Sequence, residues 1–156
     1  MSITKLNNLS VSALTALPSG VGGKVLQVQS FTYGTEETTS STSFVASSLT
    51  KSSTPSSASN KILIMVSGTQ ATSGPASECI ATIFRGATNL GNSYGISYTY
   101  NVSNANHSGI SMNYLDSPNT TSSTTYTMYF KATGAHAQYV QRNGALSTII
   151  LMEISA

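Results

Sequence analysis

Short runs of β-branched and aromatic residues, each closed by turn-forming residues, recur along the chain after residue 23. Such residues fit the pleated surface of a sheet, and no segment of this body has the composition typical of a long helix. The runs predict about nine strands that begin about every 10 to 14 residues. This spacing is typical of an all-β sandwich or jelly roll.

The expected strands are residues 24–30, 42–45, 61–66, 79–85, 94–102, 109–115, 124–130, 138–142 and 146–154, with loops at 51–60 and 69–77. Residues 62–66 and 148–154 are apolar without alternation, which is typical of strands buried on both faces. In a monomeric sandwich one face of each strand is wet, so we expect these strands to contact another subunit. The candidate interface residues are Ile62, Ile64, Ile150 and Met152.

Charged residues make up only 8 % of the 156 residues, and the net charge is +2. Ordinary domains contain about 25 % charged residues. No cluster of Lys or Arg predicts a nucleic-acid partner or an anionic membrane surface. No apolar run approaches the roughly 20 residues that span a bilayer, and residues 1–8 lack a signal-peptide pattern. We expect a protein made in the cytoplasm, with a surface of hydroxyl and amide groups suited to work outside cells.

The first 22 residues differ from the rest of the chain. Apolar residues punctuate a polar background at Ile3, Leu6, Leu9, Leu14 and Leu17, and a Gly-rich stretch follows at 18–23. One interpretation is a frayed terminus. The other is an arm that docks onto a partner, and the Gly-rich hinge favours it. We therefore divide the chain into an attachment arm, residues 1–22, and a sandwich domain, residues 23–156.

Catalysis needs a positioned acid, base or nucleophile, and acidic residues are few. The carboxylates are Glu36, Glu37, Glu78, Asp116 and Glu153. The adjacent Glu36 and Glu37 point to opposite faces of a strand. Asp116 is expected to bond local backbone N–H groups in a turn, and Glu153 is expected to form an interface ion pair. The sequence therefore predicts no enzyme and no catalytic residue.

Metal ligands are also few. His107 and His136 lie far apart in sequence, and a metal site needs about three protein ligands. A trimer that gathers three copies of one histidine on its axis is the remaining alternative. Cys79 lies among apolar residues and is interpreted as a small buried hydrophobe. We expect no metal and no cofactor.

Three tyrosines, Tyr94, Tyr98 and Tyr100, are spaced so that they share one face of a predicted strand. One interpretation is that they pack the sandwich or line a trimer interface. The other is a glycan-binding platform, in which ring faces contact sugar C–H groups. Further tyrosines are expected in neighbouring strands at Tyr114, Tyr126 and Tyr129.

Several segments together resemble a jelly-roll domain of tail-fibre and decoration proteins of tailed phages, particularly cyanophage-like ones. These segments are residues 23–28, 42–45, 60–66, 84–86, 115–118, 124–126 and 147–154. Residues 3–6 also resemble the opening of short phage fibre and head-fibre proteins. The resemblance implies a jelly-roll β-sandwich of about eight or nine antiparallel strands, carried as a homotrimer on the outer surface of a virion.

The resemblance leaves three functions open. The first is a capsid decoration or cement protein that stabilises the head, attached by its arm to the major capsid protein or another virion protein. The second is a tail-fibre or receptor-binding tip that recognises a host surface glycan. A fibre normally adds a long shaft, for which the arm leaves no room, and this favours decoration. The third is a free lectin-like module or an enzyme accessory.

Overall fold

A computed structural model describes residues 24–102 and 104–156, which form eleven strands and one short 3-10 turn, η1 (Arg142–Gly144). The all-β prediction is confirmed. The strands are β1 (Val25–Tyr33), β2 (Glu37–Thr39), β3 (Val45–Ser53), β4 (Lys61–Thr72), β5 (Ser77–Arg85), β6 (Thr88–Asn89), β7 (Ser97–Asn101), β8 (Asn106–Asp116), β9 (Thr124–Lys131), β10 (Gln138–Val140) and β11 (Ser147–Ile154).

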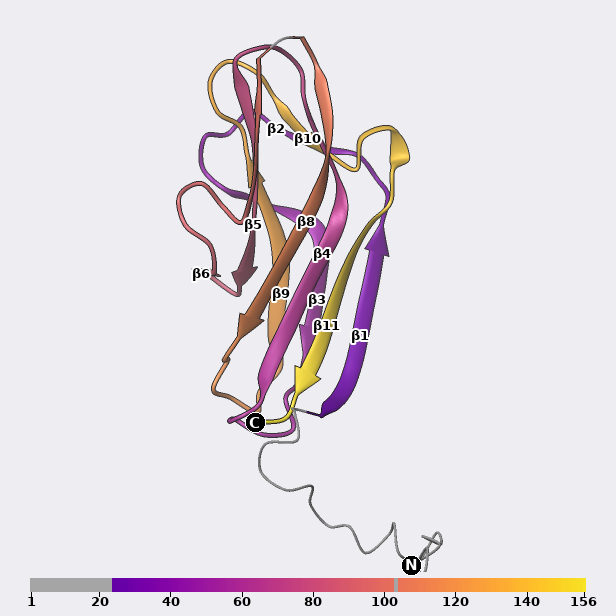
Figure 1. The fold of residues 1–156 in the computed structure, drawn as a ribbon, viewed down its shortest axis with the longest axis vertical. Helices are drawn as coiled ribbons and strands as arrows, with labels where there is room; N and C mark the ends of the chain where they lie inside the picture. The colour runs from indigo at the N-terminus through magenta and orange to yellow at the C-terminus, as the bar shows by residue number, and fades with distance from the viewer. Residues whose placement is uncertain (1–23, 103) are drawn as a thin grey trace, which may run out of the picture.

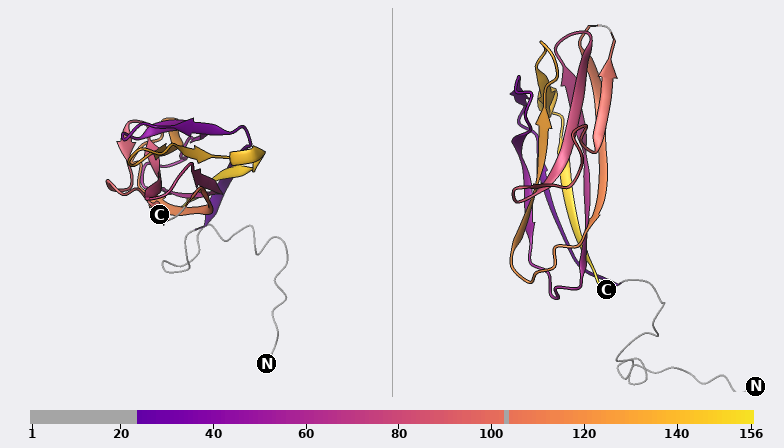
Figure 2. Two further views of the ribbon diagram at one scale, coloured as in Figure 1. Left: turned by 90° about the horizontal axis from the view of Figure 1, so that it is seen from above. Right: turned by 90° about the vertical axis from the view of Figure 1, so that its left-hand side faces the viewer.

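The strands form two antiparallel sheets that run along the long axis of the body (Figures 1 and 2). In the first sheet the order is β1-β11-β4-β8, and β10 and β2 continue beside the far end of β4. In the second sheet the order is β3-β9-β5-β7, with β6 paired to the end of β5. The eight longest strands thus alternate early and late chain segments in two four-stranded sheets, which is the order of a jelly roll.

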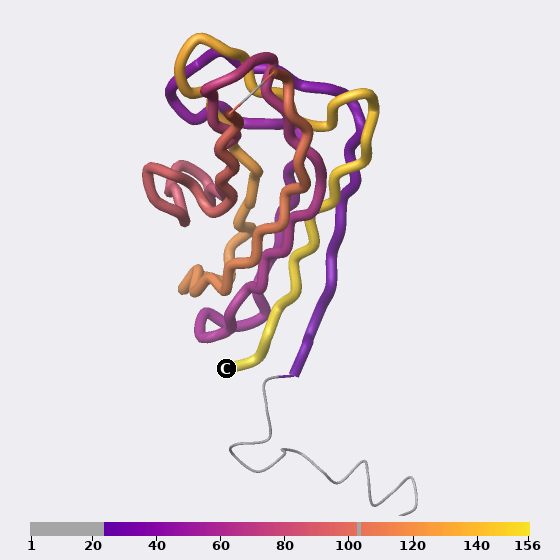
Figure 3. The backbone as a smooth tube through the Cα atoms, turned by 45° about the horizontal axis from the view of Figure 1, so that its top comes forward, coloured from indigo at the N-terminus to yellow at the C-terminus, as the bar shows by residue number. Residues whose placement is uncertain are grey.

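The first and last strands illustrate this order. β1 lies beside β11 over most of its length, with Val28 opposite Met152 (Figure 3). Lys24 and Ser155 are tied by two hydrogen bonds, one donated by each backbone N–H. The beginning of the described chain is therefore fixed against its end.

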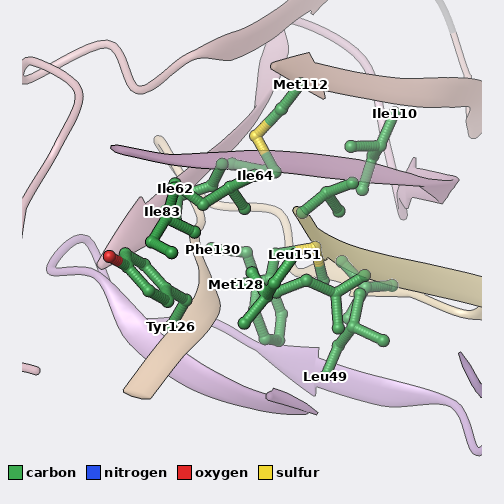
Figure 4. Packing of buried hydrophobic residues seen from close by; sticks show 14 residues of the cluster. Leu49, Ile62, Ile64, Ile83, Ile110, Met112, Tyr126, Met128, Phe130 and Leu151 are labelled. Carbon is green, nitrogen blue, oxygen red and sulfur yellow. The ribbon is translucent and has the colours of Figure 1, made fainter. Parts of the chain in front are cut away.

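Inward side chains of the two sheets meet in one apolar core (Figure 4). In β9 and β11 every second residue is buried, which places alternate side chains in the core. Burying one such Leu, Ile or Met contributes about 1.5–3 kcal/mol. The largest of the fully buried apolar side chains are Tyr126, Phe130, Leu49, Ile62, Ile64, Ile80, Ile83, Met112, Met128, Ile149 and Leu151.

Two of the expected interface residues belong to this core. Ile62 and Ile64 are 0 % exposed and face the second sheet, so the prediction that they contact another subunit is wrong. The alternation of β4 directs Leu63 and Met65 outward instead. An uninterrupted apolar run does not reveal which half of its residues faces the core.

The polar strands were predicted least well. β3 extends through residues 51–53, which were expected in a loop, and residues 42–44 precede it. Pairs of hydroxyl groups join β3 to β9, with Oγ1 atoms of Thr50 and Thr127 2.7 Å apart. β4 likewise continues through part of the expected loop at 69–77. Its buried Gln70 accepts a hydrogen bond from Gln138, so partners in the fold allow a polar strand end to be buried.

A polar cross-link joins the sheets near the start of β4. The Arg85 guanidinium donates to Asp116 at 2.8 Å, and the buried Tyr126 hydroxyl donates to the same carboxylate at 2.7 Å. Asp116 therefore connects β8 with β5 and β9. The prediction that it bonds local backbone N–H groups is wrong, because it ends a strand and points across the core.

Candidate functional site

The outer face of the first sheet carries a row of apolar side chains, one from each of its four main strands. The register aligns Val28 with Met152, Met152 with Leu63, and Leu63 with Leu115. At the two ends of the row Val28 is 57 % exposed and Leu115 is 51 % exposed. Water therefore contacts a continuous apolar band across the whole width of this sheet.

A second row lies beside the first and widens the band. It contains Ile150 and Met65, which pair directly, between Ser30 and Asn113. Neither row contains a charged side chain. We define the apolar face by the six apolar residues of the two rows, Val28, Leu63, Met65, Leu115, Ile150 and Met152.

Contiguous exposed apolar side chains mark surfaces that interact with other molecules. Of the four expected interface residues, the structure places Ile150 and Met152 on the apolar face. Sequence reasoning missed Leu63 and Met65, because the apolar run at 62–66 does not indicate which of its side chains face the core. It missed Val28 and Leu115 because their strands alternate and, taken alone, look like ordinary half-buried strands.

A second exposed cluster, the tyrosine platform, consists of Tyr94, Tyr98 and Tyr100. These residues are 62 %, 46 % and 52 % exposed. Tyr98 and Tyr100 lie on β7, whereas Tyr94 lies in the turn before it and not in the strand as predicted. The interpretation that these rings pack the sandwich is wrong for this chain, since they point to solvent. Their place at a subunit interface stays a prediction.

The rings of the platform are connected. Those of Tyr94 and Tyr98 meet edge to face with centroids 5.9 Å apart. The Tyr98 hydroxyl donates a hydrogen bond of 2.8 Å to Oε1 of Glu78, and this bond is the main cause that raises the Tyr98 pKa. Tyr100 lies directly opposite Glu78 in the β5–β7 pairing. The platform thus has one carboxylate among three phenol rings.

Hydrogen bonds to Asn92 hold the backbone of Tyr94 in place. Its N–H donates to Oδ1 of Asn92 at 2.8 Å, and the N–H of Gly95 donates to the Asn92 carbonyl. Lys131 donates to the carbonyl of Ser93 at 2.8 Å, which ties the turn to β9. Gly95 has φ +69°, and a Cβ there would lie 2.3 Å from the Ala81 carbonyl oxygen. Only glycine allows this close approach.

The remaining tyrosines expected nearby do not join the platform. Tyr126 is fully buried, Tyr114 packs against the core, and Tyr129 stacks on Phe84 with ring centroids 3.9 Å apart.

Each of the five carboxylates accepts a hydrogen bond from this chain. Glu36 accepts one from the Asn143 N–H, and Glu37 accepts from the backbone and side chain of Ser48. The Glu36 contact joins segments that are far apart in sequence, and the Glu37 contact joins β2 to β3, so these carboxylates link loops and strands.

Glu153 is 1 % exposed and does not form the expected interface ion pair. Burial would raise its pKa, but hydrogen bonds from Asn60, Gln27 and Ser56 outweigh burial and lower it to about 2. Ser56 donates both its N–H and its hydroxyl to Oε1 at 2.7 Å. The prediction was wrong because the loop after β3 folds back over the last strand and supplies these donors.

The candidate metal ligands remain separate. His107 is exposed on β8, and His136 lies in a loop beside Gly74. Cys79 is 2 % exposed, as expected of a small buried hydrophobe, and burial raises its thiol pKa to about 12. No three His, Cys, Asp or Glu side chains of residues 24–102 and 104–156 are grouped so that they could hold a metal.

The described part of the chain contains no helix long and apolar enough to cross a membrane. The expected arm residues Ile3, Leu6, Leu9, Leu14 and Leu17 lie outside the described residues. No protein-family model matches the chain, and no curated protein matches it.

Proposed function

We propose that this chain is a non-enzymatic structural protein of a bacteriophage virion, a capsid decoration or cement protein that sits as a trimer on the head and stabilises the shell. The observation that carries the proposal is the apolar face, whose register aligns Val28, Met152, Leu63 and Leu115 across four strands. The jelly-roll strand order is consistent with the resemblance to phage decoration and fibre domains.

Self-association follows from the chemistry of this face. Removal of apolar surface from water is favourable by about 25 cal/mol per Å². The two rows contain no charge whose desolvation would oppose contact. Three copies that bury these faces gain stability by mass action and present a rigid unit to the shell. In this proposal residues 1–22 act as the attachment arm.

The oligomeric state of the chain tests whether the apolar face mediates self-association. We expect light scattering of the full chain at micromolar concentration to give the mass of a trimer. Met152→Glu introduces a charge into the middle of the apolar face and should shift the chain to a monomer. Ala46→Glu, at an exposed position on β3 of the second sheet, is the matched control and should leave the trimer intact. A monomeric wild-type chain contradicts the proposal.

Copy number tests the place on the virion. Hundreds of copies per purified particle on a stained gel are expected of a decoration protein. A second candidate function, a tail-fibre or receptor-binding tip, is favoured by the exposed tyrosine platform and predicts a few dozen copies or fewer. Deletion of residues 1–22 should abolish attachment and leave a folded trimer, and a truncated protein that still binds particles contradicts the arm.

A further inference from the structure

The tyrosine platform has the features of a ligand site. We propose that Tyr94, Tyr98, Tyr100 and Glu78 bind a neutral oligosaccharide. This activity goes beyond the proposed structural role and depends on neither the trimer nor the arm.

The three rings of the platform are exposed to solvent. Three tyrosines that lie within one short stretch each leave about half of their side-chain surface in water. A tyrosine combines an apolar ring with a polar tip and usually buries the ring. A pyranose presents the complementary surface, with C–H groups on its faces and hydroxyls at its rim. Exposed rings beside hydrogen-bonding groups therefore match a sugar better than a purely apolar partner.

The platform also offers hydrogen-bonding groups beside its rings. Oε1 of Glu78 accepts from Tyr98, while its Oε2 and the hydroxyls of Tyr94 and Tyr100 have no hydrogen-bond partner among the described residues. A carboxylate oxygen accepts from a sugar hydroxyl in a charge-assisted hydrogen bond, which is stronger than a neutral one. The phenol hydroxyls both donate and accept.

The site is formed before a ligand arrives. The bond to Glu78 fixes the Tyr98 ring, and the hydrogen-bonded turn from Asn92 to Gly95 fixes the backbone of Tyr94. Binding then costs less side-chain and loop entropy, which matters for a ligand with few apolar contacts. Tyr100 is placed by the β5–β7 pairing.

Charge selects a neutral ligand. Glu78 is the carboxylate of the platform and repels an anionic sugar. Lys131, which ties down the turn before β7, donates to the Ser93 carbonyl and lies 4.8 Å from the centroid of the Phe44 ring, so its charge already has two partners within the described chain. An anionic sugar therefore meets the Glu78 carboxylate without a free ammonium group to offset it among the described residues that form the platform and its turn.

Saturation-transfer NMR on the full chain tests the proposal. The probes are the neutral trisaccharides chitotriose, maltotriose and laminaritriose, with 3′-sialyllactose as the anionic comparison. We expect saturation of ring C–H protons in at least one neutral probe and none in the anionic one. Tyr94→Ala and Tyr98→Ala should each weaken binding by at least about tenfold, the effect of losing one well-placed aromatic contact.

Two further variants separate stacking from hydrogen bonding. Tyr98→Phe keeps the ring but loses the bond to Glu78, and we expect a smaller loss than in Tyr98→Ala. Phe31→Ala removes a 38 % exposed aromatic ring from the other sheet and should leave sugar binding unchanged. Circular dichroism should show that all variants fold, because the truncated side chains are exposed.

The proposal is overturned if no neutral probe shows saturation transfer, if only 3′-sialyllactose does, or if Tyr94→Ala and Tyr98→Ala bind as the wild type does. Because the assay uses isolated protein and exposed residues away from the apolar face, its failure is distinguishable from a failure of the proposed virion function, which is measured by copy number and mass.

Discussion

Glu153 makes the free energy of unfolding of this fold depend on pH in the acidic range. Its pKa is about 2 in the folded chain, against an ordinary value of 4.5. A group whose pKa is lowered by folding stabilises the fold fully above its unfolded pKa, and this stability is lost as pH falls toward the folded pKa. We therefore expect the free energy of unfolding to decrease between about pH 5 and pH 2.

The size of the effect follows from the two pKa values. At 1.36 kcal/mol per pKa unit, the difference between 4.5 and about 2 corresponds to about 3 kcal/mol. Water reduces this value, because the donor Ser56 is itself exposed. We expect a contribution of about 1.5 to 2 kcal/mol at pH 7.

Glu153→Gln isolates this contribution. The glutamine keeps an oxygen that accepts from Ser56 and Asn60. In the wild type the amide of Gln27 donates to the other carboxylate oxygen, so in the variant two N–H donors face each other there. Urea unfolding at several pH values should show a less stable variant at pH 7 and a shallower loss of stability below pH 5.

The matched control is Glu36→Gln, which alters an exposed carboxylate with a single bond to the Asn143 N–H and should change stability at pH 7 by less than about 0.5 kcal/mol. The reasoning is refuted if Glu153→Gln keeps the pH dependence of the wild type, because another group then supplies it.

Three further perturbations test the fold and the sites. Tyr126→Phe deprives Asp116 of a buried hydrogen bond and should lower the free energy of unfolding by about 1.5 to 3 kcal/mol in urea. Gly95→Ala places a Cβ against the Ala81 carbonyl at positive φ and should destabilise the fold by at least about 1 kcal/mol in thermal unfolding; an unchanged midpoint contradicts the turn geometry. Cys79 should react with iodoacetamide only after unfolding, and rapid labelling of the native chain contradicts its burial and raised pKa.

The sequence predicted the apolar strands well because alternation and β-branched residues record local packing. It predicted β3 poorly, because a strand of serine and threonine resembles a loop until its hydroxyl partners on β9 are known. The jelly-roll order was expected from a resemblance and is confirmed by the pairing of β1 with β11 and of β4 with β8.

The candidate surfaces were predictable only in part. Tyr98 and Tyr100 were placed on one face by their spacing, but Glu78 is far from them in sequence and joins the platform only through the β5–β7 pairing. The same holds for the apolar face, where Val28 and Leu115 become neighbours of Met152 and Leu63 through the sheet register. Spacing along one strand is local information, and the register between strands is not.

The two surfaces lie on different sheets, and this separation has a functional consequence. The apolar face belongs to β1, β11, β4 and β8, whereas the platform belongs to β7 and the turn before it, on the outer side of the second sheet. A chain that buries its apolar face against other copies therefore keeps the tyrosines accessible. The proposed assembly and the proposed sugar binding should accordingly be separable: Met152→Glu should abolish the trimer and leave the affinity per chain unchanged, and Tyr98→Ala should do the reverse. Trimer formation should affect sugar binding only through avidity, because a trimer presents three platforms to a multivalent glycan surface.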